Sequence, residues 1–167
     1  MRAISFRGLT VALFVLAFIA DIGFAFAGPF EDALAAYDRQ EYGTALQLMR
    51  PLADQGNADA QNGMGALYYH GYGVPADFKE ALKWYRLAAA QGNLDAQVNL
   101  GSMYYEGEGV AEDLPHSHMW LSIVADQGNV EAAKMRDAVL KEMTAAQVSQ
   151  SQTLQRRCKE SNFKQCD

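Results

Sequence analysis

Two consecutive stretches of this chain repeat one pattern, and that pattern decides the fold. Residues 60–95 read AQNGMGALYYHGYGVPADFKEALKWYRLAAAQGNLD, and residues 96–131 read AQVNLGSMYYEGEGVAEDLPHSHMWLSIVADQGNVE. Aligned without a gap, the two stretches are identical at 14 of 36 positions. Self-similarity at a fixed period of this length is typical of repeat proteins, in which each unit buries its apolar face against its neighbours.

Each repeat unit is predicted to form two helices joined by a tight turn. In the first unit, Met64 and Leu67 recur at helical spacing and mark the buried face of the first helix. Gly71 and Gly73 then end that helix, because a tight turn needs positive φ and glycine adopts it at little steric cost. Asp77 is a suitable N-cap for the second helix.

The pattern continues in weaker form on both sides of the two full repeats. A partial copy predicts helices over residues 30–38 and 42–54, and a degenerate copy predicts helices over 130–142 and 145–157. The fold class is therefore all-α, an α/α superhelix of eight helices in four antiparallel pairs. The predicted parts are an N-terminal capping pair at 28–59, repeats at 60–95 and 96–131, a C-terminal capping pair at 132–157, and a cysteine-bounded tail at 158–167.

Five further residues indicate how these helices begin and pack. Gly65 and Gly101 lie inside predicted helices, where glycine costs ~1 kcal/mol relative to alanine, so we expect neighbouring helices to approach closely there. Pro115 falls in the first turn of a helix, where proline is tolerated. Thr144 followed by Gln147 is a capping box that starts the last helix.

The repeated motif, A-x-x-x-[LM]-G-x-x-Y-x-x-G-x-G-V-x-x-D followed by W and A-x-Q-G-N, resembles the Sel1-like repeat, a relative of the tetratricopeptide repeat. The match departs at residues 115–118, where the family has a K-A-hydrophobic stretch, so the packing of that helix is expected to differ. The matching positions are Ala60, Met64, Gly65, Tyr68, Gly71, Gly73, Val74, Asp77, Trp84 and Gly92 in the first unit, and Ala96, Leu100, Gly101, Tyr104, Gly107, Gly109, Val110, Asp113, Trp120 and Gly128 in the second.

A binding surface is expected on the concave face, which the first helix of each pair lines in stacked helix pairs. Tyr68 and Tyr104 share the apolar stripe and are predicted to be core, whereas Tyr69 and Tyr105 point about 100° away, onto the groove wall. Two interpretations of Tyr69 and Tyr105 remain open: partner contact, or packing on the adjacent repeat. His70 and Glu106 then fall near the rim of the groove, and the analogy with tetratricopeptide grooves adds residues further along the same helices. The predicted partner-binding residues are Asn62, Tyr69, His70, Asn99, Ser102, Tyr105 and Glu106.

The N-terminus has the pattern of an export signal. Arg2 and Arg7 form a positive region, residues 9–20 are an apolar run, and residues 25–27 read A-F-A, a small-x-small cleavage site. We predict cleavage after Ala27 and a secreted or periplasmic protein without stable membrane insertion. A retained signal anchor is the alternative.

The charge of the chain argues against two classes of partner. The formal net charge is -6, and residues 28–155 hold 17 acidic and 8 basic side chains. An acidic body repels phosphate, so neither nucleic acid nor an anionic membrane surface is an expected partner.

Both cysteines lie near the C-terminus. An exported chain enters an oxidising compartment, where Cys158 and Cys166 are predicted to form one disulfide that pins the tail. A redox-active pair would sit closer together, as Cys-x-x-Cys, and a metal site would need further ligands nearby.

No catalytic residue, metal ligand or cofactor is predicted. His116 and His118 do not share a helical face and are expected to be solvated. Ser161 and Lys164 spell S-x-x-K without the S-D-N and K-T-G motifs that accompany it in penicillin-recognising enzymes. The flanks of the Glu106, Glu108 and Glu112 cluster offer no pocket that would desolvate a carboxylate.

The resemblance implies an exported, non-enzymatic adaptor or regulator that binds a segment of an envelope protein through its concave helix face. One alternative is a β-lactamase-like hydrolase, since some cysteine-rich relatives have been described as such. Those relatives carry a cysteine pair in each repeat, and residues 60–131 contain none. The other alternative is a structural module that binds an envelope glycan.

Overall fold

The computed structural model describes residues 28–166; Asp167 and the predicted export signal in residues 1–27 lie outside the described residues. All regular secondary structure in the described part is helical, which confirms the all-α prediction. The helices are α1 (Pro29–Asp38), α2 (Tyr42–Asp54), α3 (Ala58–His70), α4 (Phe78–Ala89), α5 (Leu94–Glu106), α6 (Leu114–Ala125), α7 (Val130–Glu142) and α8 (Ala145–Glu160).

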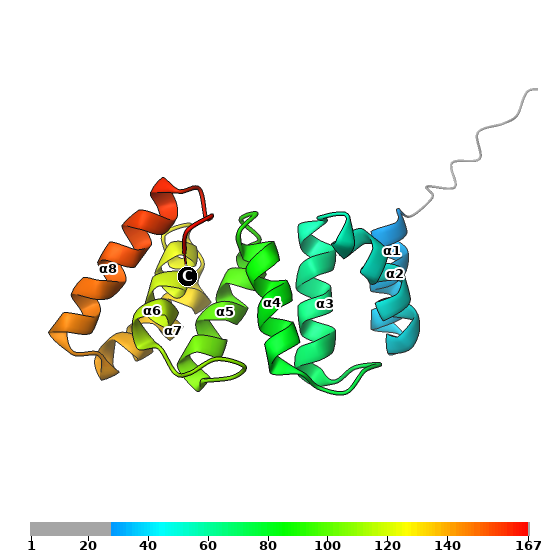
Figure 1. Ribbon diagram of the computed structural model, residues 1–167, viewed down its shortest axis with the longest axis horizontal. Coiled ribbons are helices and arrows are strands. Elements are labelled where there is room, and N and C mark those ends of the chain that lie inside the picture. The colour runs from blue at the N-terminus through cyan, green and yellow to red at the C-terminus, as the bar shows by residue number, and fades with distance from the viewer. Residues whose placement is uncertain (1–27, 167) are drawn as a thin grey trace, which may run out of the picture.

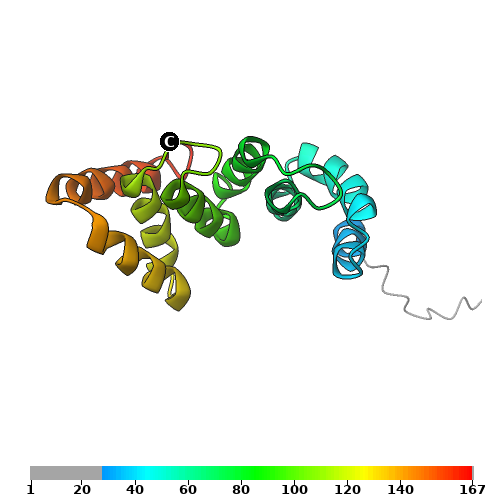
Figure 2. The same cartoon turned by 90° about the horizontal axis from the view of Figure 1, so that it is seen from below.

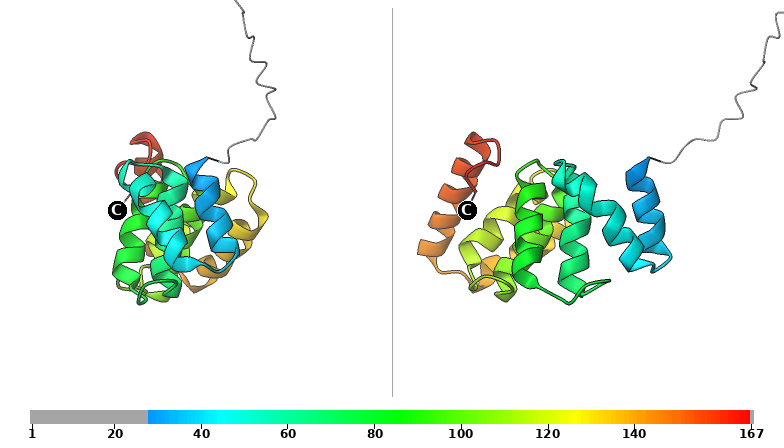
Figure 3. Two further views of the ribbon diagram at one scale, coloured as in Figure 1. Left: turned by 90° about the vertical axis from the view of Figure 1, so that its right-hand side faces the viewer. Right: turned by 45° about the vertical axis from the view of Figure 1, so that its right-hand side comes forward.

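The helices follow one another along an arc. Each of α1 to α6 packs against the next helix in the chain, and Figure 2 shows the succession curving from the N-terminal pair to the C-terminal helices. The two ends of the arc are far apart, with α1 and α8 at opposite sides of the molecule in Figure 1 and in the right-hand view of Figure 3. This elongated shape is that of a solenoid, in which each unit contacts only its neighbours.

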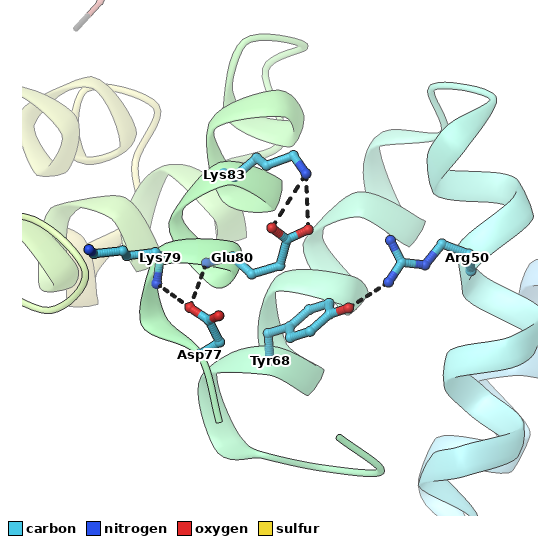
Figure 4. Close-up of polar contacts among 6 residues, drawn as sticks. All are labelled: Arg50, Tyr68, Asp77, Lys79, Glu80 and Lys83. Atoms are coloured by element: carbon cyan, nitrogen blue, oxygen red, sulfur yellow. Dashed lines mark hydrogen bonds and ion pairs between the residues drawn. The ribbon is translucent and has the colours of Figure 1, made fainter. Parts of the chain in front are cut away.

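The helix ends carry repeated caps. Gly71 and Gly107 end α3 and α5 in the left-handed conformation, with φ of 70° and 72°. The predicted Asp77 cap is confirmed, because its carboxylate accepts hydrogen bonds from the backbone N–H groups of Lys79 and Glu80 at 3.0 Å (Figure 4). The predicted capping box at the start of α8 and the position of the proline in the first turn of α6 are confirmed too. The sequence reasoning missed three asparagine N-caps at the 36-residue step, Asn57, Asn93 and Asn129.

Gly65 in α3 and Gly101 in α5 mark close helix contacts, as predicted. A Cβ atom on Gly65 would lie 2.5 Å from the Tyr85 ring, and one on Gly101 would lie 2.7 Å from Leu121 Cγ. These contacts bring α3 against α4 and α5 against α6. Because glycine has no side chain, the two helices of each pair can pack at a short distance from one another.

An arginine links each repeat to the one before it. Arg50 on α2 donates a 2.5 Å hydrogen bond to the Tyr68 hydroxyl on α3 (Figure 4), and Arg86 makes the equivalent 2.7 Å bond to Tyr104, 36 residues later. Tyr104 is buried, as predicted. The core prediction for Tyr68 was only partly right, since it is half-buried with its hydroxyl at the repeat boundary.

The C-terminal end departs from simple stacking of pairs. Helices α7 and α8 both pack against α6, so α8 is not placed chiefly against its sequence neighbour. Lys159 and Asp126 pair at 2.7 Å at one end of the α6–α8 contact. Leu154 and Cys158 join the same buried cluster as the helices of the two full repeats. This arrangement closes the C-terminal end of the core.

The two histidines of α6 are not solvated, contrary to the sequence prediction. His116 Nδ1 pairs with Asp113 at 2.8 Å and its ring stacks on Tyr104, while His118 Nδ1 forms a 2.8 Å hydrogen bond with the Ser151 hydroxyl of α8. Burial lowers the pKa of His118. The prediction failed because α6 is enclosed by α5, α7 and α8, which leaves few of its positions facing water.

The predicted disulfide is present, joining Cys158 and Cys166. Both cysteines are buried, and Phe163 between them packs on the main core cluster. None of the helices in residues 28–166 combines the length and apolar character that crossing a bilayer requires.

Candidate functional site

A hollow between α3 and α5, which we call the polar hollow, gathers most of the residues predicted to bind a partner. Its volume is about 220 Å³. Five of the seven predicted residues line it, four from the facing turns of α3 and α5 and one from the end of α5. The lining residues are Tyr69, His70, Tyr85, Asn99, Ser102 and Glu106.

The two remaining predicted residues lie next to this hollow. Asn62 accepts a 3.2 Å hydrogen bond from the Asn99 side-chain amide and so joins α3 to α5. Tyr105 lines a second hollow, and its hydroxyl donates a 2.6 Å hydrogen bond to the Glu142 carboxylate at the end of α7. The predicted residues therefore lie on α3 and α5, and Tyr105 connects them to α7 through Glu142.

Tyr69 packs on the core and also lines the polar hollow, while its contact with a partner stays a prediction. It is half-buried and packs on the main core cluster. Its ring meets Phe78 edge-on at 5.3 Å between centroids and His70 at 4.9 Å. Tyr105 is more open, with 36% of its surface exposed.

Two carboxylates crowd the Tyr69 hydroxyl. Burial, together with the neighbouring carboxylates of Glu108 and Glu106, raises the pKa of Tyr69 far above its usual range. Desolvation, followed by the neighbouring Glu108, raises the pKa of Glu106. This corrects the expectation that nothing near the glutamate cluster would desolvate a carboxylate. The signal was missed because the covering surface comes from α3, in the other repeat.

The carboxylates have no cation of their own within the described residues. No Lys or Arg in residues 28–166 forms an ion pair with Glu106 or Glu108. One carboxylate oxygen of Glu108 is buried and has no hydrogen-bond partner among the described residues. A buried polar atom without a partner is costly, so this oxygen lowers the stability of the turn that follows α5.

The second hollow, which we call the apolar hollow, lies between α5, α6 and α7. Its volume is about 200 Å³, and the residues that line it from α6 and α7 are all apolar. It shares Ser102 and Glu106 with the polar hollow, so the two hollows are neighbours along α5. The lining residues are Gly101, Ser102, Tyr105, Glu106, Leu121, Met135, Ala138 and Val139.

Replacing Glu106 by glutamine is expected to stabilise the fold slightly at neutral pH. The pKa of Glu106 is raised in the folded state, so its contribution is favourable only when it is protonated and is lost as the pH rises through the folded-state pKa. Because Glu106 is exposed, the gain at pH 7 is expected to stay below about 1 kcal/mol. Thermal unfolding of both proteins from pH 4 to pH 8 measures it. A gain of equal size at pH 4 and pH 7 would contradict this electrostatic origin.

The described residues contain no group of three or more His, Cys, Asp or Glu side chains able to hold a metal ion together. Ser161 of the S-x-x-K stretch lies in the tail, where its hydroxyl donates to the Cys158 carbonyl and accepts from the Gln165 N–H, both at 2.9 Å. The groups that line the polar hollow are aromatic rings, an amide, a hydroxyl and a carboxylate.

The curved stack of helix pairs and the surface along its inner helices define an α-solenoid. The Sel1 repeat family model matches residues 58–93 and 94–129, each match beginning at the first residue of α3 or α5. The chain therefore contains two Sel1 repeats. Such repeats form folds that are typically non-catalytic, and proteins built from them generally bind other proteins.

Solved structures support this assignment. The chain is similar to c5321, a protective antigen of uropathogenic Escherichia coli with an SLR fold, with 28% identity and a TM-score of 0.76 over 81% of this chain and 31% of that one. It is also similar to a Sel1 repeat protein from Oxalobacter formigenes, with 31% identity and a TM-score of 0.63 over 66% of this chain and 46% of that one. The chain therefore spans less than half the length of either structure. No curated protein shows significant similarity to it.

Proposed function

We propose that this Sel1 repeat protein is an exported adaptor or regulator that holds a segment of an envelope protein on its concave face. The observation that carries the proposal is the polar hollow, where α3 and α5 bring together amide, hydroxyl, carboxylate and aromatic groups. Tyrosine beside such groups is typical of protein-recognition surfaces, because it offers a rigid contact area with a hydrogen-bonding end.

Export is supported by two features of the chain. The first is the signal pattern before Ala27, and the second is the Cys158–Cys166 disulfide, since disulfides persist in oxidising compartments. Mass spectrometry of the protein recovered from the cell envelope is expected to give a chain that begins at Gly28. Recovery of a chain that still carries residues 1–27 would favour the retained-anchor alternative.

The concave-face proposal is tested by site-specific crosslinking in living cells. A photo-crosslinking amino acid at Ser102, which lines both hollows, is expected to capture one envelope protein. The same amino acid at the exposed Glu160 of α8 is the matched control and is expected to capture none. Equal adducts at both positions, or none at Ser102, would contradict the proposal.

Loss of the two tyrosine rings is expected to release the partner. Since truncation of a central tyrosine commonly costs about 2 kcal/mol or more of binding free energy, Tyr69→Ala with Tyr105→Ala is expected to lower the yield of the Ser102 adduct by about tenfold or more. Thermal unfolding of the double variant checks that it is folded. An unchanged yield from a folded double variant would move the interface away from this face.

An envelope glycan is the second candidate ligand, because a sugar can stack on a tyrosine ring while hydrogen-bonding Asn99 and Ser102. Calorimetry with soluble envelope glycans distinguishes the two candidate ligands, because measurable binding would favour the glycan over the protein segment. The hydrolase alternative receives no support from the site, since the Ser161 hydroxyl is engaged within the tail.

A further inference from the structure

We propose that the polar hollow receives a lysine or arginine side chain of the partner segment, while the apolar hollow receives an aliphatic side chain from a neighbouring position of the same segment. This inference rests on the proposed function and names the chemistry of the anchor that the concave face selects.

The size of the hollows favours single side chains. Their volumes of about 220 and 200 Å³ both fall below the roughly 300–1,000 Å³ of small-molecule and cofactor sites. Each hollow is therefore suited to one side chain of a polypeptide that lies across the inner helices, and neither is suited to a cofactor.

The negative charge at the polar hollow favours an occupant with a positive charge. Glu108 raises the cost of ionising Glu106, and the described residues supply no Lys or Arg to pair with either carboxylate. The exposed Glu106 carboxylate and the Tyr69 ring both line the polar hollow, and the negative charge of Glu108 lies next to both residues. An ammonium or guanidinium group in the hollow would pair with the Glu106 carboxylate, and its aliphatic stem would lie along the ring.

The protein already uses this chemistry at its own repeat boundaries. Arg50 lies over the Tyr68 ring at 5.7 Å and over the Trp84 ring at 5.2 Å, and Arg86 lies over the Tyr104 ring at 5.9 Å. The polar hollow has tyrosines and the Glu106 carboxylate among its lining residues and no arginine of this chain. A basic side chain from a partner would complete the same kind of contact.

The apolar hollow selects a second, aliphatic residue. Leu121, Met135 and Val139 form much of its wall, and methionine adapts its shape to different aliphatic occupants. The two hollows share Ser102 and Glu106, which are one helical turn apart on α5. One short segment can therefore fill both, so the expected motif is a basic residue with Val, Leu, Ile or Met within two positions.

The test selects random heptapeptides displayed on phage against the protein purified from cells that express the full chain. We expect the selected peptides to be enriched in a Lys or Arg with an aliphatic residue within two positions. A synthetic peptide of the selected sequence is expected to lose about tenfold in affinity when its basic residue is replaced by glutamine. Affinity is also expected to fall when NaCl is raised from about 50 to about 500 mM, since exposed charges are screened.

Protein variants locate the two anchors. Glu106→Gln and Glu108→Gln are each expected to lower the affinity for the basic peptide by about tenfold and to leave that for its glutamine variant unchanged. Met135→Gln is expected to weaken only peptides that keep the aliphatic residue. Glu160→Gln, an exposed carboxylate on α8, is the matched control and is expected to change nothing.

The outcomes separate this inference from the proposal on which it rests. Selected peptides that lose binding on Tyr69→Ala but lack basic residues would overturn the cationic anchor and leave the peptide-binding face in place. The cationic anchor is overturned in the same way if Glu106→Gln and Glu108→Gln weaken basic and glutamine peptides equally. If no selected peptide depends on Tyr69 or Tyr105, both the anchor and the concave-face proposal fail.

Discussion

Gly109→Ala is expected to lower the free energy of unfolding by about 3–4 kcal/mol, since it combines an unfavourable backbone conformation with a clash against backbone. Gly109 has a φ of 71°, which an L side chain adopts only at a cost. A Cβ atom there would overlap the Phe78 carbonyl group, with 2.6 Å to its carbon. The turn of the second repeat thus rests on the start of α4, and no flexible side chain can yield. Urea unfolding followed by far-ultraviolet circular dichroism measures the loss.

Two other glycines act as matched controls for this prediction. Gly73, one repeat earlier, has a φ of 73° and would place a Cβ 2.8 Å from the Tyr42 carbonyl carbon, so Gly73→Ala is expected to cost a similar amount. Gly56 has a φ of 93° with nothing within 4 Å, so Gly56→Ala is expected to cost only about 1–2 kcal/mol. If Gly109→Ala costs no more than Gly56→Ala, backbone contact does not set the position of the turn.

Removal of the disulfide is expected to have the second largest effect. Closing the short loop between Cys158 and Cys166 stabilises the fold by roughly 2–3 kcal/mol on the chain-entropy account, and both cysteines are buried. The Cys158→Ala/Cys166→Ala double variant is therefore expected to unfold roughly 10 °C below wild type. Calorimetry of both proteins measures the difference.

Reduction provides the control for the disulfide prediction. A reducing agent is expected to lower the unfolding temperature of wild type and to leave that of the double variant unchanged. Hydrogen exchange is expected to increase around Phe163, which packs on the core only while the tail is held. If wild type melts at the same temperature after complete reduction, the tail contributes nothing to the stability of the solenoid.

Much of the fold follows from local signals in the sequence. The 36-residue step predicted the helices, and Asp77 and Thr144 were recognised as caps, because capping depends on residues within one turn. Gly65 and Gly101 pointed to close helix contacts, since an interior glycine needs a compensating approach of a neighbour. The histidines of α6 were misjudged, because His116 stacks on Tyr104 of α5 and His118 bonds Ser151 of α8, and no local pattern reveals either contact.

The candidate site was predictable in its residues and not in its chemistry. Helical periodicity placed Tyr69, Asn99 and Ser102 on the inner face, and the structure brings them to one hollow. Neither Tyr85, which lines the hollow, nor Glu108, which lies next to Tyr69, was predicted to take part. Tyr85 reaches the hollow past the side-chain-free Gly65, and Glu108 meets Tyr69 only because the turn of one repeat folds beside the helix of the other.

The sequence by itself determined the repeat, its helices, the turns at positive φ and the pairing of two cysteines, because each depends on residues close together in the chain. The tertiary structure alone decided that α8 docks on α6, and that Glu106 is desolvated beside Glu108 and Tyr69. It also decided that two hollows adjoin along α5. These features depend on the curvature between repeats, which is the sum of many packing contacts across residues about 36 positions apart.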